Sequence, residues 1–361
     1  MQKEMNIAFI TPSLKFGGRE RVLSKLINFF SQQEDPNVHV ILYAKKREIN
    51  FEIDPKTIIH TPEFSANCNE KFYALKSLRY IRKTVKCNKI DTIVSFEEKW
   101  NRFALLAVAG LKLRRIISNR NNPYRDYGFI DRKLAQWLYP KVDVLIAQTN
   151  IAKEVYEKKY KLKKCVVIGN PIDKLDVDFS KVERENIIIC VSRLMKSKNH
   201  DRLVKIFSET QNENWKLILV GGDHGNQNIS QQLREQIKSL NLEDKVVLVG
   251  ASKEVNEYLL KSKIFAFTSE REGFPNVVGE AMAAQLPVVS YDCVAGPRDM
   301  IDDGINGYLV PVYDDNLFVE RLNHLMNNEN IREEMGLRAA EKIRQFDSEI
   351  ICKKFYNIIS E

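Results

Sequence analysis

Residues 264–287, IFAFTSEREGFPNVVGEAMAAQLP, decide the fold that the sequence predicts. Residues 264–268 are apolar and have the length of a buried strand, and Gly273 and Pro275 then mark a loop. A helix is expected from about Asn276, and the next strand begins near Pro287. A buried strand, a loop, a short helix and another strand make one repeat of a parallel α/β sheet.

The same alternation runs along the rest of the chain in two series. The first predicted strands are 6–11, 38–43, 92–95, 115–118, 142–147 and 165–168; the second are 187–191, 216–220, 246–249, 264–268 and 287–290. Helical patterns such as 19–30 and 201–209 lie between strands, which implies parallel sheets covered on both faces. We therefore predict an α/β protein with two Rossmann-like, doubly wound domains joined by the polar stretch 170–186. Ligands of such sheets bind at the carboxyl ends of the strands, and the cleft between two such domains is the expected site.

The net charge of +8 is unevenly spread along the chain. Residues 1–170 hold 32 basic and 17 acidic side chains, whereas residues 171–361 hold 24 and 31. A basic front half suggests an anionic partner, and nucleic acid, an anionic membrane and a phosphate-bearing substrate all qualify. A basic surface kept for solubility is the alternative.

The six cysteines are scattered without CxxC or CxxH spacing. This argues against a zinc site or a disulfide framework and fits a reducing cytoplasm. The first residues contain too short an apolar run for a signal peptide, and no stretch approaches the roughly 20 apolar residues that span a bilayer. We expect a cytoplasmic protein, either soluble or peripheral to a membrane.

Two glutamates flank the loop and the predicted helix start at 272–280. The loop would carry Glu272 to the strand ends, and Glu280 would follow about one turn into the helix. A carboxylate there can accept two hydroxyl hydrogen bonds, from a ribose at Glu280 and from a sugar ring at Glu272. The free N–H groups at the helix start, those of Asn276, Val277 and Val278, would face a phosphate. A solvated face is the alternative for two glutamates, but here both flank a glycine-bearing loop.

Two other strand-to-helix loops carry groups suited to phosphate. Arg193 and Lys198 follow the predicted strand 187–191, where arginine offers a planar fork and lysine a point charge to a diphosphate. Gly17 and Gly18 follow the first strand, where the missing Cβ lets the backbone approach a ligand in front of a helix N-terminus. Solvated charge and a tight turn are the alternatives.

On these residues the sequence resembles the retaining family 4 glycosyltransferases of the GT-B fold. The stretch EGFPNVVGE at 272–280 matches that family's E-x7-E motif. Other matching pieces follow in order: Gly17-Gly18, Ser192-Arg193 with Lys198, LILVGGD at 217–223, GPRD at 296–299 and NGYL at 306–309. The resemblance covers nearly the whole chain and is most specific over 187–310. It is strongest to transferases that extend lipid-linked glycans for bacterial capsule, O-antigen, lipopolysaccharide and protein-glycan synthesis.

The resemblance implies a role for each matching residue. Arg193 and Lys198 would hold the donor diphosphate, Glu272 the donor sugar and Glu280 the ribose. Further donor contacts would come from Gly273, Phe274, Pro275, Asn276, Val277, Val278 and Gly18, while Gly17 and Arg120 would lie on the acceptor side. It implies domains at 1–170 (acceptor side) and 171–345 (donor binding), with a C-terminal helix at 346–361 packing back on the first domain.

The implied reaction moves a hexosyl or N-acetylhexosaminyl group from a nucleotide sugar to a glycan acceptor, with retention of anomeric configuration. The family favours a UDP-sugar as donor and a polyprenyl-diphosphate-linked glycan as acceptor. The basic pair and a helix dipole would stabilise the charge on the departing diphosphate, so neither a metal nor a cofactor is expected.

Arg120, in SNRNNP at 118–123, stands where many members of the family carry a histidine. An arginine does not exchange protons near neutral pH, so a proton-transfer role does not carry over. Arg120 would instead stabilise developing charge or hold an anionic acceptor. Asp176-Val177-Asp178 matches the DxD metal motif of the other glycosyltransferase fold, but it lies in the linker rather than after a strand, so we assign it no metal.

Other functions stay open at this point. Another GT-B-type enzyme, such as a sugar-nucleotide epimerase or an inverting transferase, would share the two domains, and a non-catalytic sugar-nucleotide-binding protein would share the site. A nucleic-acid-binding protein would stack bases on Phe72, Tyr73 and Tyr80.

Residues 71–87 instead predict an amphipathic helix, with Phe72, Leu75 and Leu78 on its apolar side. The basic face of this helix bears Lys76, Arg79, Lys83 and Lys86. It suits an anionic membrane, so we expect a peripheral protein on the inner face of the cell membrane and no nucleic acid.

Overall fold

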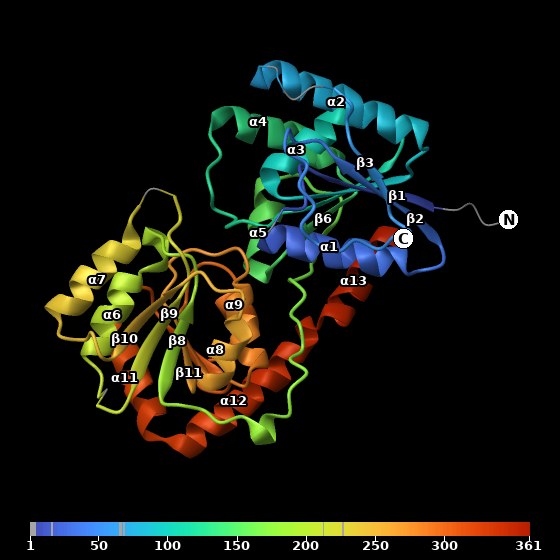
Figure 1. The fold of residues 1–361 in the computed structure, drawn as a ribbon. Coiled ribbons are helices and arrows are strands. Elements are labelled where there is room, and N and C mark those ends of the chain that lie inside the picture. Colours follow the sequence, from blue (N-terminus) through green and yellow to red (C-terminus); the bar gives the residue numbers. More distant parts are fainter. Residues whose placement is uncertain (1–4, 16, 65–66, 68, 212, 226) are drawn as a thin grey trace. The chain divides into compact units, whose positions relative to one another are not determined.

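The computed structural model describes residues 5–15, 17–64, 67, 69–211, 213–225 and 227–361, which form two compact units. Unit 1 comprises Met1–Pro171 and Ser348–Glu361, and unit 2 comprises Ile172–Asp347. Each unit is a parallel sheet flanked by helices (Figure 1). The predicted fold class, two doubly wound parallel α/β sheets, is confirmed.

The described strands of unit 1 form a seven-stranded sheet in the order β3-β2-β1-β4-β5-β6-β7. They are β1 (Met5–Thr11), β2 (Pro36–Leu42), β3 (Ile58–His60), β4 (Thr92–Phe96), β5 (Arg114–Ser118), β6 (Val144–Ala147) and β7 (Cys165–Val167). The helices are α1 (Gly18–Ser31), α2 (Glu70–Cys87), α3 (Glu98–Ala107), α4 (Phe129–Leu138), η1 (Tyr139–Lys141), α5 (Asn150–Lys159) and α13 (Ser348–Ser360).

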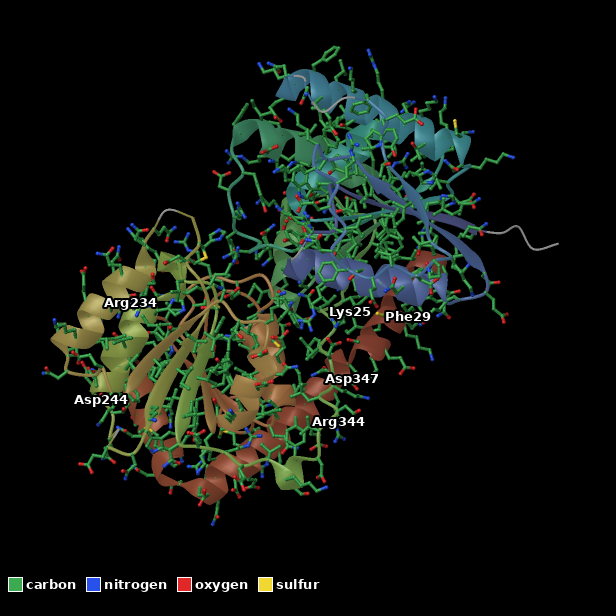
Figure 2. The ribbon with its side chains drawn as sticks, viewed as in Figure 1. Lys25, Phe29, Arg234, Asp244, Arg344 and Asp347 are labelled. Atoms are coloured by element: carbon green, nitrogen blue, oxygen red, sulfur yellow. The ribbon has the colours of Figure 1, made fainter. Side chains whose placement is uncertain are left out.

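Helices α2, α3 and α4 lie together on one side of this sheet, with α1 and α13 on the other (Figure 1). On the first side Ile81 of α2 and Ala104 of α3 pack in one cluster with Ile93 of β4. On the second side the Tyr356 ring of α13 lies 6.3 Å from that of Phe29 on α1, and Lys25 Nζ donates to Ser348 Oγ at 3.3 Å (Figure 2). The last helix of the chain is therefore part of unit 1.

The core face of α2 differs from the predicted one. Its buried residues are Tyr73, Ser77, Ile81, Thr84 and Val85. Phe72 and Leu75, predicted on the apolar side, are 53% and 44% exposed, whereas Leu78, the third residue predicted there, packs against the core cluster. Ile81 and Val85 of this face pack in the core cluster, and the Ser77 hydroxyl on the same face donates to the carbonyl of Tyr43 at 3.4 Å.

The described strands of unit 2 form a six-stranded sheet in the order β10-β9-β8-β11-β12-β13. They are β8 (Ile187–Val191), β9 (Lys216–Val220), β10 (Val246–Gly250), β11 (Ile264–Phe267), β12 (Val288–Tyr291) and β13 (Gly307–Val310). The helices are η2 (Phe179–Lys181), η3 (Lys196–Lys198), α6 (His200–Ser208), α7 (Ile229–Ser239), α8 (Val255–Lys261), α9 (Asn276–Ala283), α10 (Pro297–Met300), α11 (Asp315–Asn327), α12 (Glu329–Ile343) and η4 (Arg344–Phe346).

Strand β8 explains why this sheet is buried on both faces. Ile188 and Cys190 join the cluster under α6, α7 and α11, while Ile187, Ile189 and Val191 join the cluster under α8, α9 and α12. A strand whose successive side chains enter opposite cores must be apolar throughout, which is the pattern of a central parallel strand.

Strands β3 and β13 lie outside the predicted set. β3 has three residues at the sheet edge, with Ile58 and Ile59 45% and 39% exposed, so no buried run marks it. β13 has four residues and begins with Gly307, a residue type that weakens strands. None of the described helices is both long enough and apolar enough to cross a bilayer.

Candidate functional site

Each sheet has one point where the strand order reverses, and the loops that leave the two strands there diverge to opposite sides. In unit 2 this point lies between β8 and β11, and in unit 1 between β1 and β4. A crevice opens at the carboxyl ends of such strands, where ligands of open α/β sheets bind. The segments singled out from the sequence, 192–198 and 268–276 in unit 2 and 12–18 in unit 1, all follow these strands.

Lys198 and Glu272 meet at the switch point of unit 2. Lys198 ends η3 after β8, Glu272 lies in the loop after β11, and the ammonium donates to the carboxylate Oε1. Their side chains are only 15% and 14% exposed. The sequence placed these residues 74 positions apart, and the fold brings them together as a partly desolvated ion pair.

Backbone and side-chain hydrogen bonds hold the two loops together. Thr268 Oγ1 donates to the carbonyl of Lys198 at 2.9 Å, and Asn199 Nδ2 donates to the carbonyl of Thr268 at 3.0 Å. The N–H of Glu270 donates to the carbonyl of Ser197 at 3.1 Å. Since these bonds fix both backbones, the ion pair has a set position before any ligand arrives.

Two glycines let neighbouring loops approach this crevice. A Cβ at Gly221, after β9, would lie 1.8 Å from the carbonyl oxygen of Ser192. Gly296, before α10, has φ +105°, and a Cβ there would lie 2.2 Å from Cδ of Pro275. Both glycines belong to segments on which the sequence resemblance rests, so those segments shape the site through close backbone contact.

Arg193 lies two residues after the end of β8 and is exposed. Its Nη1 lies 3.3 Å from Nδ1 of His224, a residue of the loop after β9. Arg193 and Lys198 therefore share one post-strand loop, as the sequence predicts, but only Lys198 of the two is drawn into an ion pair with Glu272.

Helix α9 begins at Asn276, as the sequence predicts. One expectation is corrected: the N–H of Val278 is not free, because it donates to the carbonyl of Pro275 at 3.0 Å in a tight first turn. Val278, Ala281 and Met282 are buried under the sheet, and Glu280 is half-buried on the same helix. Phe274 is buried, with its ring 5.4 Å from that of Phe346, so it anchors the loop.

In unit 1, Gly17 and Gly18 are exposed, and α1 begins at Gly18; Phe16, which precedes them, lies outside the described residues. Arg19 of this turn donates through Nη1 to Glu97 Oε2 at 2.6 Å, and through Nη2 to Glu20. Glu97 follows β4, so this cluster marks the switch point of unit 1.

Arg120 follows β5 at the same edge of that sheet. Its guanidinium lies 4.4 Å from the Phe96 ring centroid and 5.5 Å from that of Phe355, and Nη1 donates to Asn170 Oδ1. Burial lowers the pKa of Arg120 to about 9, against the opposing effect of Glu98, so the group stays cationic at neutral pH. Its Nε and Nη2 are buried without a hydrogen-bond partner among the described residues.

Comparison with known proteins assigns the chain. Residues 171–342 match the family described as "Glycosyl transferases group 1", and residues 16–174 match "Glycosyltransferase Family 4". The chain is 31% identical over 359 residues to N-acetylgalactosamine-N,N'-diacetylbacillosaminyl-diphospho-undecaprenol 4-alpha-N-acetylgalactosaminyltransferase of Campylobacter jejuni, covering 94% of this chain and 95% of the relative. The chain belongs to the group 1 glycosyltransferases.

Two further comparisons agree with this assignment. The glycosyltransferase is 28% identical to the amylovoran biosynthesis glycosyltransferase AmsD of Erwinia amylovora over 353 residues, covering 95% of this chain and 96% of the relative. Anabaena Alr3699/HepE, solved in complex with UDP, aligns with a TM-score of 0.81 at 20% identity, covering 99% of this chain and all of that one. The fold is GT-B.

Two residues of this glycosyltransferase's site escaped the sequence reasoning. His200 is 2% exposed and its Nε2 lies 2.9 Å from Ser192 Oγ; burial, with the charge of Lys198 adding, lowers its pKa to about 4. Burial and nearby Glu272 raise the pKa of the Cys293 thiol to about 12. Both act as neutral packing around the ion pair, and neither belongs to a motif that the sequence displays.

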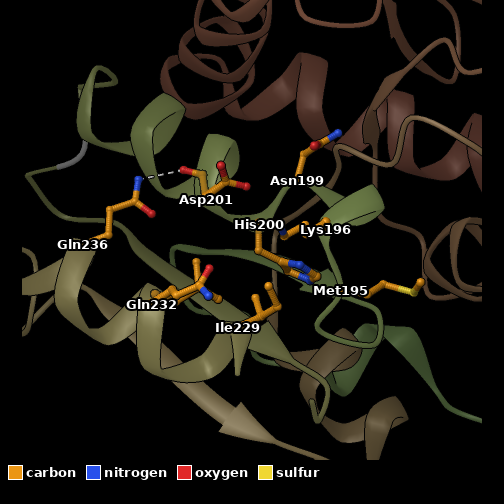
Figure 3. Close-up of a pocket in the computed structure, with 9 residues that line it drawn as sticks. Met195, Lys196, Asn199, His200, Asp201, Ile229, Gln232 and Gln236 are labelled. Carbon is orange, nitrogen blue, oxygen red and sulfur yellow. Dashed lines mark hydrogen bonds between the residues drawn. The ribbon is translucent and has the colours of Figure 1, made fainter. Parts of the chain in front are cut away.

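A cavity of about 270 Å³ lies behind η3, between α6 and α7 of the glycosyltransferase (Figure 3). Lys196, His200 and Gln232 line it, and Gln236 Nε2 donates to the carbonyl of Asp201 at 2.9 Å beside it. The predicted donor residues do not line this cavity.

The DxD stretch of the glycosyltransferase lies before η2 rather than at a strand end. Asp178 accepts hydrogen bonds from Ser180 N at 3.2 Å and Oγ at 2.6 Å, and lies 3.1 Å from Lys181 Nζ. The carboxylate is thus engaged by its own turn. Within the described ranges, no group of three or more His, Cys, Asp or Glu side chains is placed to hold a metal ion.

Proposed function

We propose that this glycosyltransferase transfers a hexosyl or N-acetylhexosaminyl group from a UDP-sugar to a polyprenyl-diphosphate-linked glycan, with retention of anomeric configuration. The names of its relatives support this choice: one acts on a diphospho-undecaprenol glycan, and another belongs to amylovoran biosynthesis. The UDP bound in Anabaena Alr3699/HepE supports a uridine donor.

The observation that carries the proposal is the meeting of Lys198 and Glu272 at the switch point of unit 2. Without a ligand the two charges balance each other. When a nucleotide sugar binds, Lys198 and Arg193 would contact the diphosphate, and Glu272 would accept hydrogen bonds from sugar hydroxyls. Glu280, half-buried on α9, would accept from the ribose.

The proposed mechanism is stabilisation of the leaving group. The bond between the anomeric carbon and the diphosphate oxygen breaks, and negative charge grows on that diphosphate. The acceptor hydroxyl oxygen bonds to the same carbon, and its proton passes to the departing diphosphate oxygen. Arg193, Lys198 and the N-terminal end of α9 oppose the growing charge. Because hydrogen bonds fix the loops in advance, little reorganisation is needed at the moment of reaction.

The two units would divide the work. Unit 2 would bind the donor, with Gly273, Phe274 and Pro275 shaping the loop in front of α9. Unit 1 would serve the acceptor through Gly17 and Arg120, and Gly18 would contribute its backbone to the donor diphosphate.

Donor screening followed by a transfer assay tests the proposal. A thermal-shift screen with UDP- and GDP-sugars should single out one UDP-sugar, because a bound ligand raises apparent stability by mass action. That donor, labelled, should then transfer to a polyprenyl-diphosphate glycan, and NMR of the product should show the donor's anomeric configuration. Donor binding without transfer or hydrolysis would indicate a binding protein, and conversion of the donor without an acceptor would indicate an epimerase.

We also propose that the basic face of α2 holds the enzyme at an anionic membrane. Arg79, Lys83 and Lys86 are exposed on it, and each basic residue near such a surface contributes about 1 kcal/mol. Arg82 does not belong to this face, because its Nη1 donates to the carbonyls of Ala107 and Ala109 at 3.2 and 2.7 Å.

The triple variant R79E/K83E/K86E should lose sedimentation with anionic vesicles and keep its thermal stability. High salt should release from the vesicles the fraction of wild-type protein that is bound by electrostatic attraction alone. Equal binding to neutral and anionic vesicles would contradict the proposal for α2.

A further inference from the structure

Large apolar side chains gather unusually on and beside α4. Seven such side chains in the described residues are more than half exposed, and four of them are Tyr124 (62%), Phe129 (67%), Ile130 (80%) and Trp137 (52%). The remaining three, Phe72, Ile305 and Leu337, are spread over three other segments. A cluster of this kind on a protein surface marks an interaction site.

The exposed face of α4 alternates aromatic and basic residues at helical spacing. Phe129, Lys133 and Trp137 of α4, and Lys141 in the following η1, succeed one another at four-residue intervals. Lys133 Nζ lies 5.7 Å from the Phe129 ring centroid, and Lys141 Nζ lies 3.6 Å from that of Trp137. Ala135 and Leu138 form the opposite, buried face. The helix therefore has two apolar faces, and only one of them is used by the core.

The surroundings of α4 are basic. Arg125, Arg132 and Lys159 line a small recess beside its first turn, where Arg102 pairs with Asp131 at 3.2 Å. In residues 124–141 four basic side chains stand against two acidic ones. Aromatic and aliphatic side chains beside lysines and arginines are the composition of a helix that lies in the interface of an anionic bilayer, since tryptophan favours the headgroup level and lysines extend toward water.

We propose that Phe129, Ile130 and Trp137 of α4 insert into the headgroup region of an anionic bilayer. Helices α2 and α4 flank α3 on one side of the sheet of unit 1 (Figure 1), so the basic face of α2 and this apolar face would act on one surface. Charge on α2 would draw the enzyme to the lipid, and α4 would hold it there. The inference deepens the proposed action on a lipid-linked acceptor, and its biological reason rests on that function.

The three tryptophans give the proposal a direct readout. Trp137 is 52% exposed, whereas Trp100 of α3 is partly buried and Trp215 is 7% exposed in the core of unit 2. On adding vesicles of phosphatidylcholine with phosphatidylglycerol, wild-type emission should shift to shorter wavelength and be quenched by lipids brominated on the upper acyl chain. The W137F variant should lose most of both signals. Unchanged wild-type emission with vesicle-bound protein would overturn the insertion of α4.

Sedimentation separates the apolar contribution from charge. The variant F129S/I130S should bind the same vesicles about tenfold or more weakly and lose the fraction that resists high salt, because burial of apolar area is insensitive to screening. L337S, a matched change at a residue 58% exposed on α12, should bind as wild type does. Equal binding of F129S/I130S and L337S would overturn the proposal.

Two controls keep this outcome apart from that of the proposed function. Donor hydrolysis by F129S/I130S in the absence of lipid should equal that of wild type, so loss of vesicle binding cannot be mistaken for loss of the active site. If light scattering instead shows a wild-type dimer that F129S/I130S dissociates, and no vesicle binding, the face is a contact between copies and the proposal fails. If the protein binds vesicles but transfers no sugar, the membrane insertion of α4 stands and only the proposed transferase function is refuted.

Discussion

The two units place an ion pair at the same topological position but surround it with opposite charge. In unit 1 Arg19, after β1, contacts Glu97, after β4, and Glu20 as well. In unit 2 Lys198, after β8, contacts Glu272, after β11. One arginine faces two carboxylates in the first case. In the second the charges balance, and Arg193 on the same loop adds a cation.

This difference shows that the charge of a whole segment does not predict the charge at its strand ends. Residues 1–170 are strongly basic, yet their switch point is acidic; residues 171–361 are acidic, yet theirs carries Arg193 as an additional cation. A diphosphate therefore suits unit 2. Unit 1 also carries exposed basic residues on α2 and around α4, for which we propose an anionic membrane as the partner.

The largest effect is expected from breaking the pair in unit 2. Lys198→Ala should lower kcat/KM by about one hundredfold or more, because it removes a prepositioned cation from the charge on the departing diphosphate. Glu272→Ala should mainly lower kcat, at a cost of roughly 1.5–3 kcal/mol. Steady-state kinetics with the donor found by screening gives both values, and wild-type rates for both variants would remove these residues from the site.

The matching change in unit 1 sharpens the comparison. Arg19→Ala leaves Glu20 and Glu97 without their shared partner and should destabilise the protein by roughly 1–3 kcal/mol. The Kd for the donor should stay within about twofold of wild type, since the change leaves Arg193, Lys198, Glu272 and Glu280 of unit 2 untouched and alters no backbone atom of Gly18. A large rise in that Kd, with stability unchanged, would reverse the roles assigned to the two pairs.

The next largest effect is expected from the substitution of Glu280. Glu280→Ala should weaken binding of the nucleoside diphosphate by about tenfold to one hundredfold, the loss of one charge-assisted contact to ribose. Isothermal titration with UDP measures it directly. Glu320→Ala, on α11 of the same unit, is the control and should bind UDP as wild type does. Equal affinity for UDP in both variants would contradict the contact between Glu280 and the ribose.

Arg193 is exposed, so its removal should cost less than that of Lys198. Arg193→Ala should lower kcat/KM about tenfold, because solvent screens part of its charge. EDTA should leave the rates of the wild type and of this variant unchanged if protein cations alone stabilise the diphosphate. Strong inhibition by EDTA, with activity restored by a divalent metal, would contradict that mechanism. It would make Asp176 and Asp178 the candidate metal ligands.

The sequence predicts the repeating elements well because buried parallel strands are apolar throughout and loops carry glycine and proline. It places Glu272 and Lys198 in loops that follow strands and predicts the start of α9. It does not predict that these two side chains form an ion pair, because only the switch in strand order brings them together. The outward Phe72 of α2 was also missed, since apolar spacing cannot tell a core face from an exposed one. His200 was missed because a lone buried histidine leaves no mark in a motif.

The smallest effect concerns one buried histidine in each unit. Burial lowers the pKa of His200 in unit 2 and of His39 in unit 1 to about 4, from 6.5. Between these values the unfolded chain binds a proton that the folded chain does not, so stability falls as pH drops from 6.5 toward 4. At about pH 5.5, one unit below the unfolded value, the share of His200 is about 1 kcal/mol.

Thermal unfolding followed from neutral pH to about pH 5.5 should therefore show a flatter acid dependence in His200→Gln than in wild type. The amide can keep a hydrogen bond to Ser192, so stability at neutral pH should change little by comparison. His39→Gln should flatten the acid dependence through unit 1 instead, and the double variant should show both changes added, because the two histidines share no partner. If His200→Gln loses stability with acid as steeply as wild type does, His200 is not the group that resists protonation behind Lys198.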